Sequence, residues 1–290
     1  MKNWLFFFTI MLTSVSFTMA QDVMLPRKSP KASCSYTIGL TDVKVTYGAP
    51  AVNGRVIWGG LVPYNQIWRA GANEATTVEF STDVNVEGQA LKAGKYALFL
   101  IPGEKEWTVI FNKNADQWGA YNYKQEDDAI RVTVEPKMNE ASQERLTYAI
   151  NDMKMDMGYI KLAWEKMRLY IRFKTDVVQQ AMNNIFNVLD TIPEQRKWMV
   201  YTQGAEFLME ADANLDQALD WAKKSTDRWN SSWNWYVLGE IQAKKGDMAA
   251  AVASGEKSIE FGMANDKDDY YKEHAEEIAK AREAWATPKN

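Results

Sequence analysis

The chain has 290 residues, of which 46% are hydrophobic, and its formal net charge is −4. This length is sufficient for two domains with cores of their own, and the charge argues against a nucleic-acid-binding protein. The single cysteine, Cys34, excludes an internal disulfide. The single histidine, His274, excludes a zinc site built on several histidines and a Ser-His-Asp triad in the N-terminal half.

The first twenty residues have the pattern of an export signal. Lys2 precedes an apolar stretch over residues 4–15, and small residues lead up to Ala20, just before Gln21. The apolar stretch is shorter than the roughly 20 residues that span a bilayer. We therefore expect cleavage near Ala20 and a periplasmic or secreted protein. A retained membrane anchor is the alternative.

After a linker over residues 21–32, residues 33–174 are predicted to form β-strands. Apolar and polar residues alternate in several short segments, as is typical of half-buried strands. The alternating apolar residues are Val43, Val45, Tyr47, Val78, Phe80, Val84, Val86, Ile130, Val132, Val134, Leu146, Tyr148 and Ile150. Turn residues predict one hairpin between residues 96–101 and 107–111, and a second, tight one at Glu165 and Lys166. Short strands without intervening helices predict an antiparallel β-sandwich that is jelly-roll-like.

Residues 58–74 form a segment too long and irregular for a hairpin. Loops of this kind on a rigid scaffold commonly carry function. Its candidate ligand-binding residues are Trp58, Tyr64, Trp68, Arg69, Asn73 and Glu74. Arg69 could pair with a carboxylate or phosphate, Glu74 could act as a general base, and the tryptophans could wall a pocket. Alternatively, Arg69 and Glu74 form an internal ion pair and the tryptophans close one end of the sandwich.

A second aromatic loop is expected over residues 112–123. Its candidate ligand-binding residues are Asn112, Trp118 and Tyr121, because aromatic side chains at a loop tip suit the recognition of a sugar or peptide. The alternative is a hydrophobic cover over a sheet edge. Asp127 and Asp128 follow, but the local sequence lacks the spacing of a calcium loop. We therefore expect no metal site.

Residues 175–290 are predicted to be α-helical and are mildly acidic. Thr191 and Glu194 have the spacing of a capping box. The serine pair that begins at Ser231 could cap a later helix, which would end at Gly246.

Part of this helical segment is similar to one tetratricopeptide (TPR) unit. The matching residues are Trp235, Leu238, Gly239, Gly246 and Ala251. In that repeat, small residues let two antiparallel helices approach closely, and a large aromatic residue fills the gap. A weaker echo begins at Ala213. The resemblance implies a TPR-like helical-hairpin domain whose concave face docks a protein partner.

Long motifs run through the predicted β domain. They are GRVIWGGLVPY from Gly54, WRAGANEAT from Trp68, AGKY from Ala93, and shorter matches at Ile101-Pro102, Trp107, Asn112-Lys113 and Trp118-Gly119. Over roughly residues 28–173 the chain resembles DUF2911, a family of bacterial exported proteins without an established activity. The family often has an arginine before the proline that is Pro50 here. This chain has Ala49 instead, so any anion contact through that arginine would be missing.

These observations favour a non-enzymatic binding protein. The β domain would hold a small molecule or a glycan, the helical domain would bind a protein partner, and no nucleic acid is expected. One alternative is a glycan- or ester-directed hydrolase that uses Arg69, Asn73 and Glu74, although no second carboxylate is fixed by the spacing. Another is a structural envelope protein. We expect no cofactor, and no transmembrane segment after removal of the signal.

Overall fold

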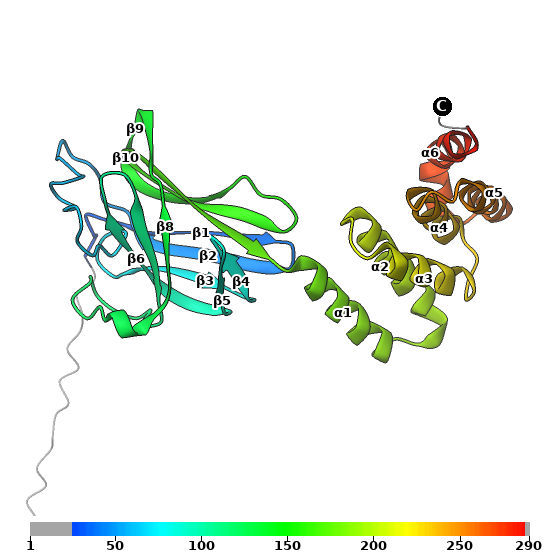
Figure 1. The fold of residues 1–290 in the computed structure, drawn as a ribbon, viewed down its shortest axis with the longest axis horizontal. Coiled ribbons are helices and arrows are strands. Elements are labelled where there is room, and N and C mark those ends of the chain that lie inside the picture. The colour runs from blue at the N-terminus through cyan, green and yellow to red at the C-terminus, as the bar shows by residue number, and fades with distance from the viewer. Residues whose placement is uncertain (1–24, 288–290) are drawn as a thin grey trace, which may run out of the picture.

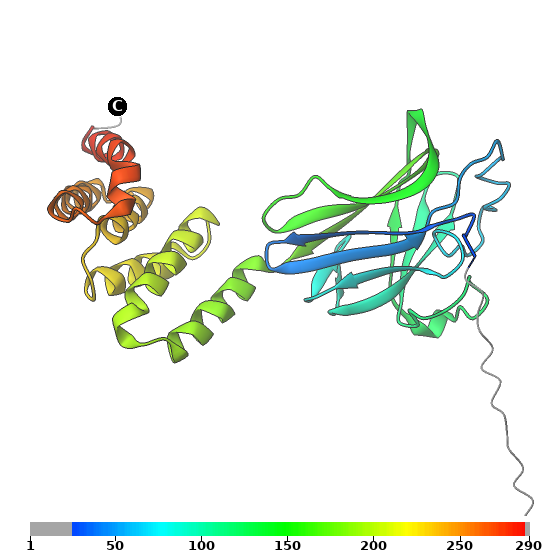
Figure 2. The ribbon, with the colours of Figure 1, turned by 180° about the vertical axis from the view of Figure 1, so that it is seen from behind.

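The computed structural model describes residues 25–287, so the predicted export signal lies outside the described residues. Within this range ten β-strands come first and six α-helices follow. Figures 1 and 2 show the strands at one end of the molecule and most of the helices at the other, with α1 between them. The predicted order of a β region followed by a helical region is therefore confirmed. None of the described helices is both long and apolar enough to cross a bilayer.

The first sheet consists of six antiparallel strands. In spatial order they are β1 (Lys31–Ile38), β2 (Thr41–Gly48), β3 (Thr76–Phe80), β6 (Gly94–Pro102), β7 (Trp107–Asn112) and β8 (Asp128–Val134). The predicted alternation is present in β2, where Val43 and Val45 are buried and Lys44 between them is exposed. The predicted hairpin after residue 96 is also confirmed, because β6 pairs with β7 and the turn lies between Pro102 and Trp107.

The second sheet consists of four antiparallel strands. In spatial order they are β5 (Gln89–Leu91), β4 (Val84–Val86), β10 (Met157–Thr175) and β9 (Lys137–Asn151). One apolar cluster takes buried residues from both sheets. In it, Phe80 of the first sheet lies 5.7 Å, between ring centroids, from Phe173 of the second. A smaller cluster around Phe99 and Ile110 lies on the opposite face of the six-stranded sheet.

The tight hairpin predicted at Glu165 and Lys166 is wrong, because β10 runs through both residues as one strand. Glu165 has a φ of 50°, and the pairing with β9 shifts register on both sides of it, as in a β-bulge. The guanidinium of Arg168 donates to the carbonyls of Glu165 and Met167 at 3.0 and 2.9 Å, and to that of Ala141 on β9 at 2.8 Å. These bonds satisfy carbonyls at the irregularity, so the chain continues as a strand.

The first helix follows β10 after a single residue. In α1 (Val177–Thr191), the side chain of the preceding residue, Asp176, accepts from the backbone N–H of Gln179 at 3.1 Å. The side chain of Gln180 donates to the hydroxyl of Thr82 at 2.9 Å. The first contact caps the helix, and the second attaches its start to the β region.

The remaining helices are α2 (Lys197–Glu210), α3 (Leu215–Thr226), α4 (Ser232–Lys244), α5 (Met248–Ala264) and α6 (Asp269–Ala286). The predicted cap of α4 is present, because Ser231 and Asn234 form a capping box. The predicted end near Gly246 is also present: α4 stops at Lys244 and Gly246 has a φ of 88°.

The capping box predicted for Thr191 and Glu194 is wrong. Thr191 is the last residue of α1, and its hydroxyl donates back to the carbonyl of Asn187 at 3.1 Å. Glu194 begins a short 3-10 turn over Glu194–Arg196 whose start has no side-chain cap. The hydroxyl is therefore used by the helix that it ends and is not free to cap the next one.

Candidate functional site

The loop of residues 58–74 has a defined shape. The carbonyl of Ala70 accepts hydrogen bonds from the hydroxyls of Thr76 and Tyr148, both at 2.9 Å. Ala70 has a φ of 57°, which is costly for a residue other than glycine and is kept only where the surroundings enforce it. The loop is thus built into the β region and can hold side chains in fixed positions.

Two of the predicted ligand-binding tryptophans belong to a cluster of four in the shared core. The cluster consists of Trp58, Trp68, Trp107 and Trp164. The Trp58 ring lies 4.7 Å from the Trp107 ring, and Trp68 stacks on Trp164 at 5.9 Å, between centroids. The indole N–H groups of Trp58, Trp107 and Trp164 have no acceptor among the described residues. Trp58 and Trp68 therefore pack against other tryptophans in the core that both sheets share.

The three polar residues of the loop do not bind one another. Glu74 accepts two hydrogen bonds from the guanidinium of Arg27, at 2.7 and 2.8 Å. The side chain of Asn73 donates to the backbone carbonyl of Ser29 at 3.0 Å. The segment just before β1, expected to be a linker, is thus held against the loop. The contribution of this N-terminal segment to the site could not be predicted from the sequence, because its residues follow no strand or helix pattern.

Arg69 is half-buried, and its guanidinium forms no ion pair or hydrogen bond with the described residues. Burial lowers the pKa of Arg69, and the nearby Tyr121 opposes this effect. The ion pair of Arg69 with Glu74, considered as an alternative, is absent from the described residues. The carboxylate of Glu74 is paired with Arg27 instead. Tyr64 lies beside Gly59, whose backbone it approaches closely.

The ion pair with Arg27 determines the chemistry of Glu74. The hydrogen bonds from Arg27 lower the pKa of Glu74, so the carboxylate stays ionised at neutral pH. An ionised carboxylate that already accepts two bonds from arginine is a weak base and cannot serve as a general acid. The geometry therefore gives Glu74 a role in fixing the N-terminal segment.

We expect Glu74→Gln to lower the free energy of unfolding by less than about 1 kcal/mol at pH 7, because both side chains are about half exposed. Because the folded-state pKa is depressed, this contribution is present above the ordinary pKa of glutamate. It disappears as the pH falls through the lowered value. Urea unfolding of the wild type and the variant at pH 7 and pH 3 measures the difference. A loss above 2 kcal/mol, or an equal loss at both pH values, would contradict this expectation.

The second predicted loop divides into a structural part and an exposed part. Asn112 is fully buried; its side chain donates to the carbonyl of Lys124 at 3.0 Å and to the carboxylate of Asp128 at 2.8 Å. Asp128 also accepts from Arg131, so its carboxylate is already occupied. Trp118 and Tyr121 are 54% and 86% exposed, respectively. Only these two aromatic side chains of the loop present large surfaces to solvent.

A polar groove of about 560 Å³ lies beside Glu74 and Trp118. Its floor is the face of β1, β2, β3 and β6 that points away from the shared core. Among its lining residues are Lys31, Lys44, Thr46, Thr77, Glu79, Lys95, Asp116 and Gln117. Gln117 is 8% exposed, and its side-chain oxygen has no partner among the described residues. Two of the predicted ligand-binding residues thus border an open polar surface.

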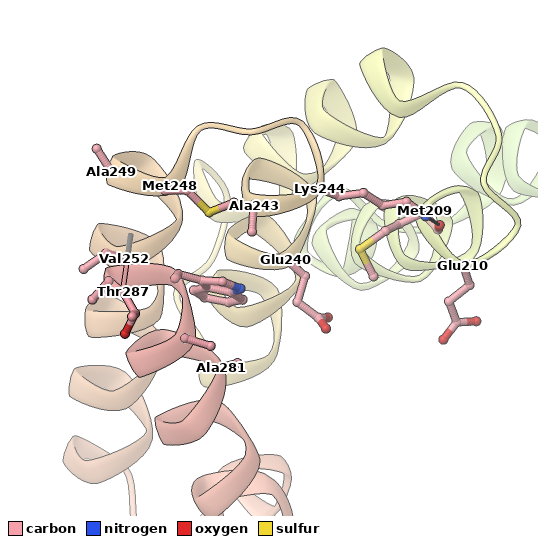
Figure 3. A pocket seen from close by; sticks show the side chains of 13 residues that line it. Met209, Glu210, Glu240, Ala243, Lys244, Met248, Ala249, Val252, Ala281 and Thr287 are labelled. Carbon is pink, nitrogen blue, oxygen red and sulfur yellow. Dashed lines mark hydrogen bonds between the residues drawn. The ribbon is translucent and has the colours of Figure 1, made fainter. Parts of the chain in front are cut away.

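A larger groove of about 1080 Å³ lies in the helical region (Figure 3). We call it the helical groove. Its residues come from α2, α4, α5, α6 and the residue that follows α6; they are Met209, Glu210, Glu240, Ala243, Lys244, Met248, Ala249, Val252, Ala281, Ala284, Trp285, Ala286 and Thr287. None of them is among the candidate residues predicted from the sequence. The one signal for the groove was the TPR resemblance, which implied a concave face without identifying its residues.

The acidic side of the helical groove has few counter-charges. Glu210 of α2 and Glu240 of α4 line the groove, and Glu206 of α2 and Glu277 of α6 act on Glu240 from nearby. None of these four carboxylates forms an ion pair with a basic side chain among the described residues. The pKa of Glu240 is raised to about 7: burial is the main cause, a hydrogen bond from Tyr236 opposes it, and the other three carboxylates add to the rise. Burial also raises the pKa of Glu206.

The comparison with known protein families gives a match over the β region. A family model described as "Protein of unknown function (DUF2911)" matches residues 29–173. The chain belongs to the DUF2911 family. The match covers the strands of both sheets almost entirely and ends within β10, so the DUF2911 part is the β region and the helical groove lies outside it. No curated protein matches this DUF2911 chain.

Proposed function

We propose that this DUF2911 protein is an exported, non-enzymatic binding protein whose helical groove docks a segment of a partner protein. The observation that carries the proposal is the helical groove itself: about 1080 Å³ with a mostly apolar lining and carboxylates on one side. Methionine side chains adapt to different partners, and alanines let a partner backbone come close. Such a surface suits a peptide segment better than a small polar substrate.

Repeated helix packing supports a TPR-like arrangement within this proposal. A Cβ atom on Gly204 of α2 would lie 2.7 Å from the ring of Trp221, and one on Gly239 of α4 would lie 2.8 Å from the ring of Trp285. In both helices a glycine allows an indole from a later helix to approach the backbone. The glycine in α2 extends the resemblance to a second helical hairpin.

The β region is part of the same proposal, as a jelly-roll-like sandwich that carries a second binding surface. The apolar cluster shared by the two sheets supports the sandwich. The polar groove supports a small polar molecule or a glycan as its ligand, because the exposed ring of Trp118 borders a surface of lysine, threonine and carboxylate side chains. Export with cleavage near Ala20 is supported by the sequence pattern of the first twenty residues.

The two alternative functions receive less support. A hydrolase that uses Arg69, Asn73 and Glu74 needs these groups around one substrate, whereas Glu74 and Asn73 are bonded to the N-terminal segment. A structural envelope protein needs no open groove, whereas the described residues form the polar groove and the helical groove. A binding protein accounts for both grooves without assigning catalysis to any residue.

The proposed docking role of the helical groove can be tested with a substitution whose side chain fills the groove. Ala284 is an exposed groove residue on α6, and Ala253 is an exposed residue on α5 that does not line the groove. We expect a phage-displayed heptapeptide library panned on the mature protein to yield peptides that bind the wild type and Ala253→Trp. Ala284→Trp should bind them at least about tenfold more weakly, because the added indole occupies the groove. Fluorescence anisotropy with the selected peptides measures the affinities.

Equal binding to all three proteins would place the peptides elsewhere and contradict the groove. A library that yields no binding peptide would contradict peptide docking altogether. Circular dichroism of both tryptophan variants shows whether the helices are intact.

A further inference from the structure

We infer that the segment docked in the helical groove is cationic: an apolar side chain seats against Trp285, and lysine or arginine side chains flank it to meet Glu210, Glu240 and Glu277. This inference rests on the proposed docking function and specifies the chemistry of the partner. It follows from the arrangement of apolar surface and charge around the groove.

The apolar part of the groove is centred on Trp285. Its ring stacks on Tyr236 with 6.1 Å between centroids and lies against Gly239, so it is held by α4 although it belongs to α6. Met209 and Met248 line the same groove from α2 and α5. A fixed indole with adaptable methionines around it forms an anchor site for one apolar side chain.

The charged part of the groove is acidic and continues along α6. Figure 3 shows Glu240 and Glu210 extending from α4 and α2 toward the same side of the groove. A neighbouring hollow shares Ala281 with the helical groove and is lined by Tyr236, Glu273, Glu276, Glu277 and Lys280. The two hollows together make one surface with carboxylates from three helices.

The lysines of this surface are already bound. The ammonium of Lys244 donates to the carbonyl of Met209 at 2.7 Å and lies 3.0 Å from the carboxylate of Asp212. Lys280 is paired with Glu276 at 2.7 Å. Neither forms an ion pair with Glu210, Glu240 or Glu277, so the negative charge of these residues is not neutralised from within the described chain.

Repulsion among these carboxylates favours the binding of a positively charged group from another molecule. Glu240 faces Glu206 and Glu210 of α2, Glu277 of α6 and Tyr236 of its own helix, and His274 of α6 acts on Glu206. Bringing ammonium or guanidinium groups to this surface replaces repulsion between like charges with attraction. A bound metal ion is a poorer occupant, because no three acidic or histidine side chains among the described residues are arranged to hold one.

The probes are three fluorescent heptapeptides with a central leucine flanked by two lysines, two glutamates or two serines. At pH 8 and physiological ionic strength, we expect the mature protein to bind the lysine peptide about tenfold more tightly than the serine peptide, and the glutamate peptide most weakly. The double variant Glu210→Gln with Glu240→Gln should lose this preference. Glu260→Gln serves as the matched control, because it removes the same charge from an exposed position outside the groove.

The affinity for the lysine peptide should also depend on pH. A cation binds the ionised form of Glu240, so its affinity falls as the pH drops from 8 to 6 and Glu240 takes up a proton. In Glu240→Gln most of this dependence should disappear, whereas the serine peptide should show little of it in either protein.

The outcomes separate this inference from the docking proposal. If the three peptides bind equally, the groove docks segments but the partner is not selected by positive charge. If the lysine preference survives in the double variant, the positive charge is recognised elsewhere and the inference about Glu210 and Glu240 is overturned. If none of the three binds, the peptides selected from the library decide: enrichment in lysine and arginine supports the inference, and its absence overturns it. If neither probes nor library bind, docking itself fails.

Discussion

We expect Trp164→Ala to lower the free energy of unfolding of the β region by about 3–5 kcal/mol. Trp164 is 1% exposed and its ring lies within 5.9 Å, between centroids, of both Trp58 and Trp68. Removing the indole leaves a cavity beside two packed rings that cannot both move to fill it. Because the indole N–H has no acceptor among the described residues, the loss comes from packing alone.

Urea unfolding combined with hydrogen exchange measured by mass spectrometry assigns the loss to a region. Protection of the amides of β3, β6 and β10 should fall, while that of α4 and α5 should stay unchanged. Trp118→Ala is the matched control, because the same residue type is removed from a 54% exposed position. A loss of unfolding free energy below about 1 kcal/mol, or one equal to that of the control, would show that the tryptophan cluster contributes little to the stability of the core.

We expect Asp268→Ala to lower the free energy of unfolding of the helical region by about 2–4 kcal/mol. The carboxylate caps α6 by accepting from the backbone N–H of Tyr271 at 2.9 Å. It also accepts from the hydroxyl of Ser232 at 2.7 Å and from its backbone N–H at 3.1 Å, at the start of α4. The substitution removes a cap and leaves the donors of fully buried Ser232 without a partner.

The neighbouring residue provides the control for this variant. Asp269 is exposed and pairs with Lys272, so Asp269→Ala should change stability by less than about 0.5 kcal/mol. Hydrogen exchange should show the loss for Asp268→Ala in α4 and α6. Because α6 carries Trp285, peptide binding in the helical groove should weaken at the same time. Unchanged protection of α6 would contradict the link between the two helices.

The chain thus carries two surfaces of different chemistry. The polar groove lies on the DUF2911 part and has side chains of both charge signs, whereas the helical groove lies outside that part and combines apolar and acidic groups.

Strand prediction succeeded where alternation was undisturbed and failed where a long-range contact intervened. In β2, Val43 and Val45 share one face because strand geometry alone places alternate residues together. At Glu165 the sequence has the character of a turn, yet the strand continues because Arg168 binds carbonyls on both β10 and β9. No local pattern contains that information, since Ala141 lies far along the chain.

The candidate binding residues also divide into those whose exposure the local sequence indicates and those whose burial depends on long-range contacts. Trp118 and Tyr121 are exposed on their loop, as aromatic residues among glycine and asparagine indicated. Trp58 and Trp68 share the same local character but are packed, because Trp107 and Trp164 come from other strands to meet them.

The sequence by itself determined the order of a β region and a helical region, most strand positions, the helix cap at Ser231 and the DUF2911 resemblance, because periodicity and local motifs belong to single elements. Only the tertiary structure decided that Arg27 forms an ion pair with Glu74 and that the guanidinium of Arg69 has no hydrogen-bond partner among the described residues. It also decided that four helices form a groove around Trp285. Ion pairs and grooves join side chains from distant parts of the chain, and only the packing of complete elements brings those side chains together.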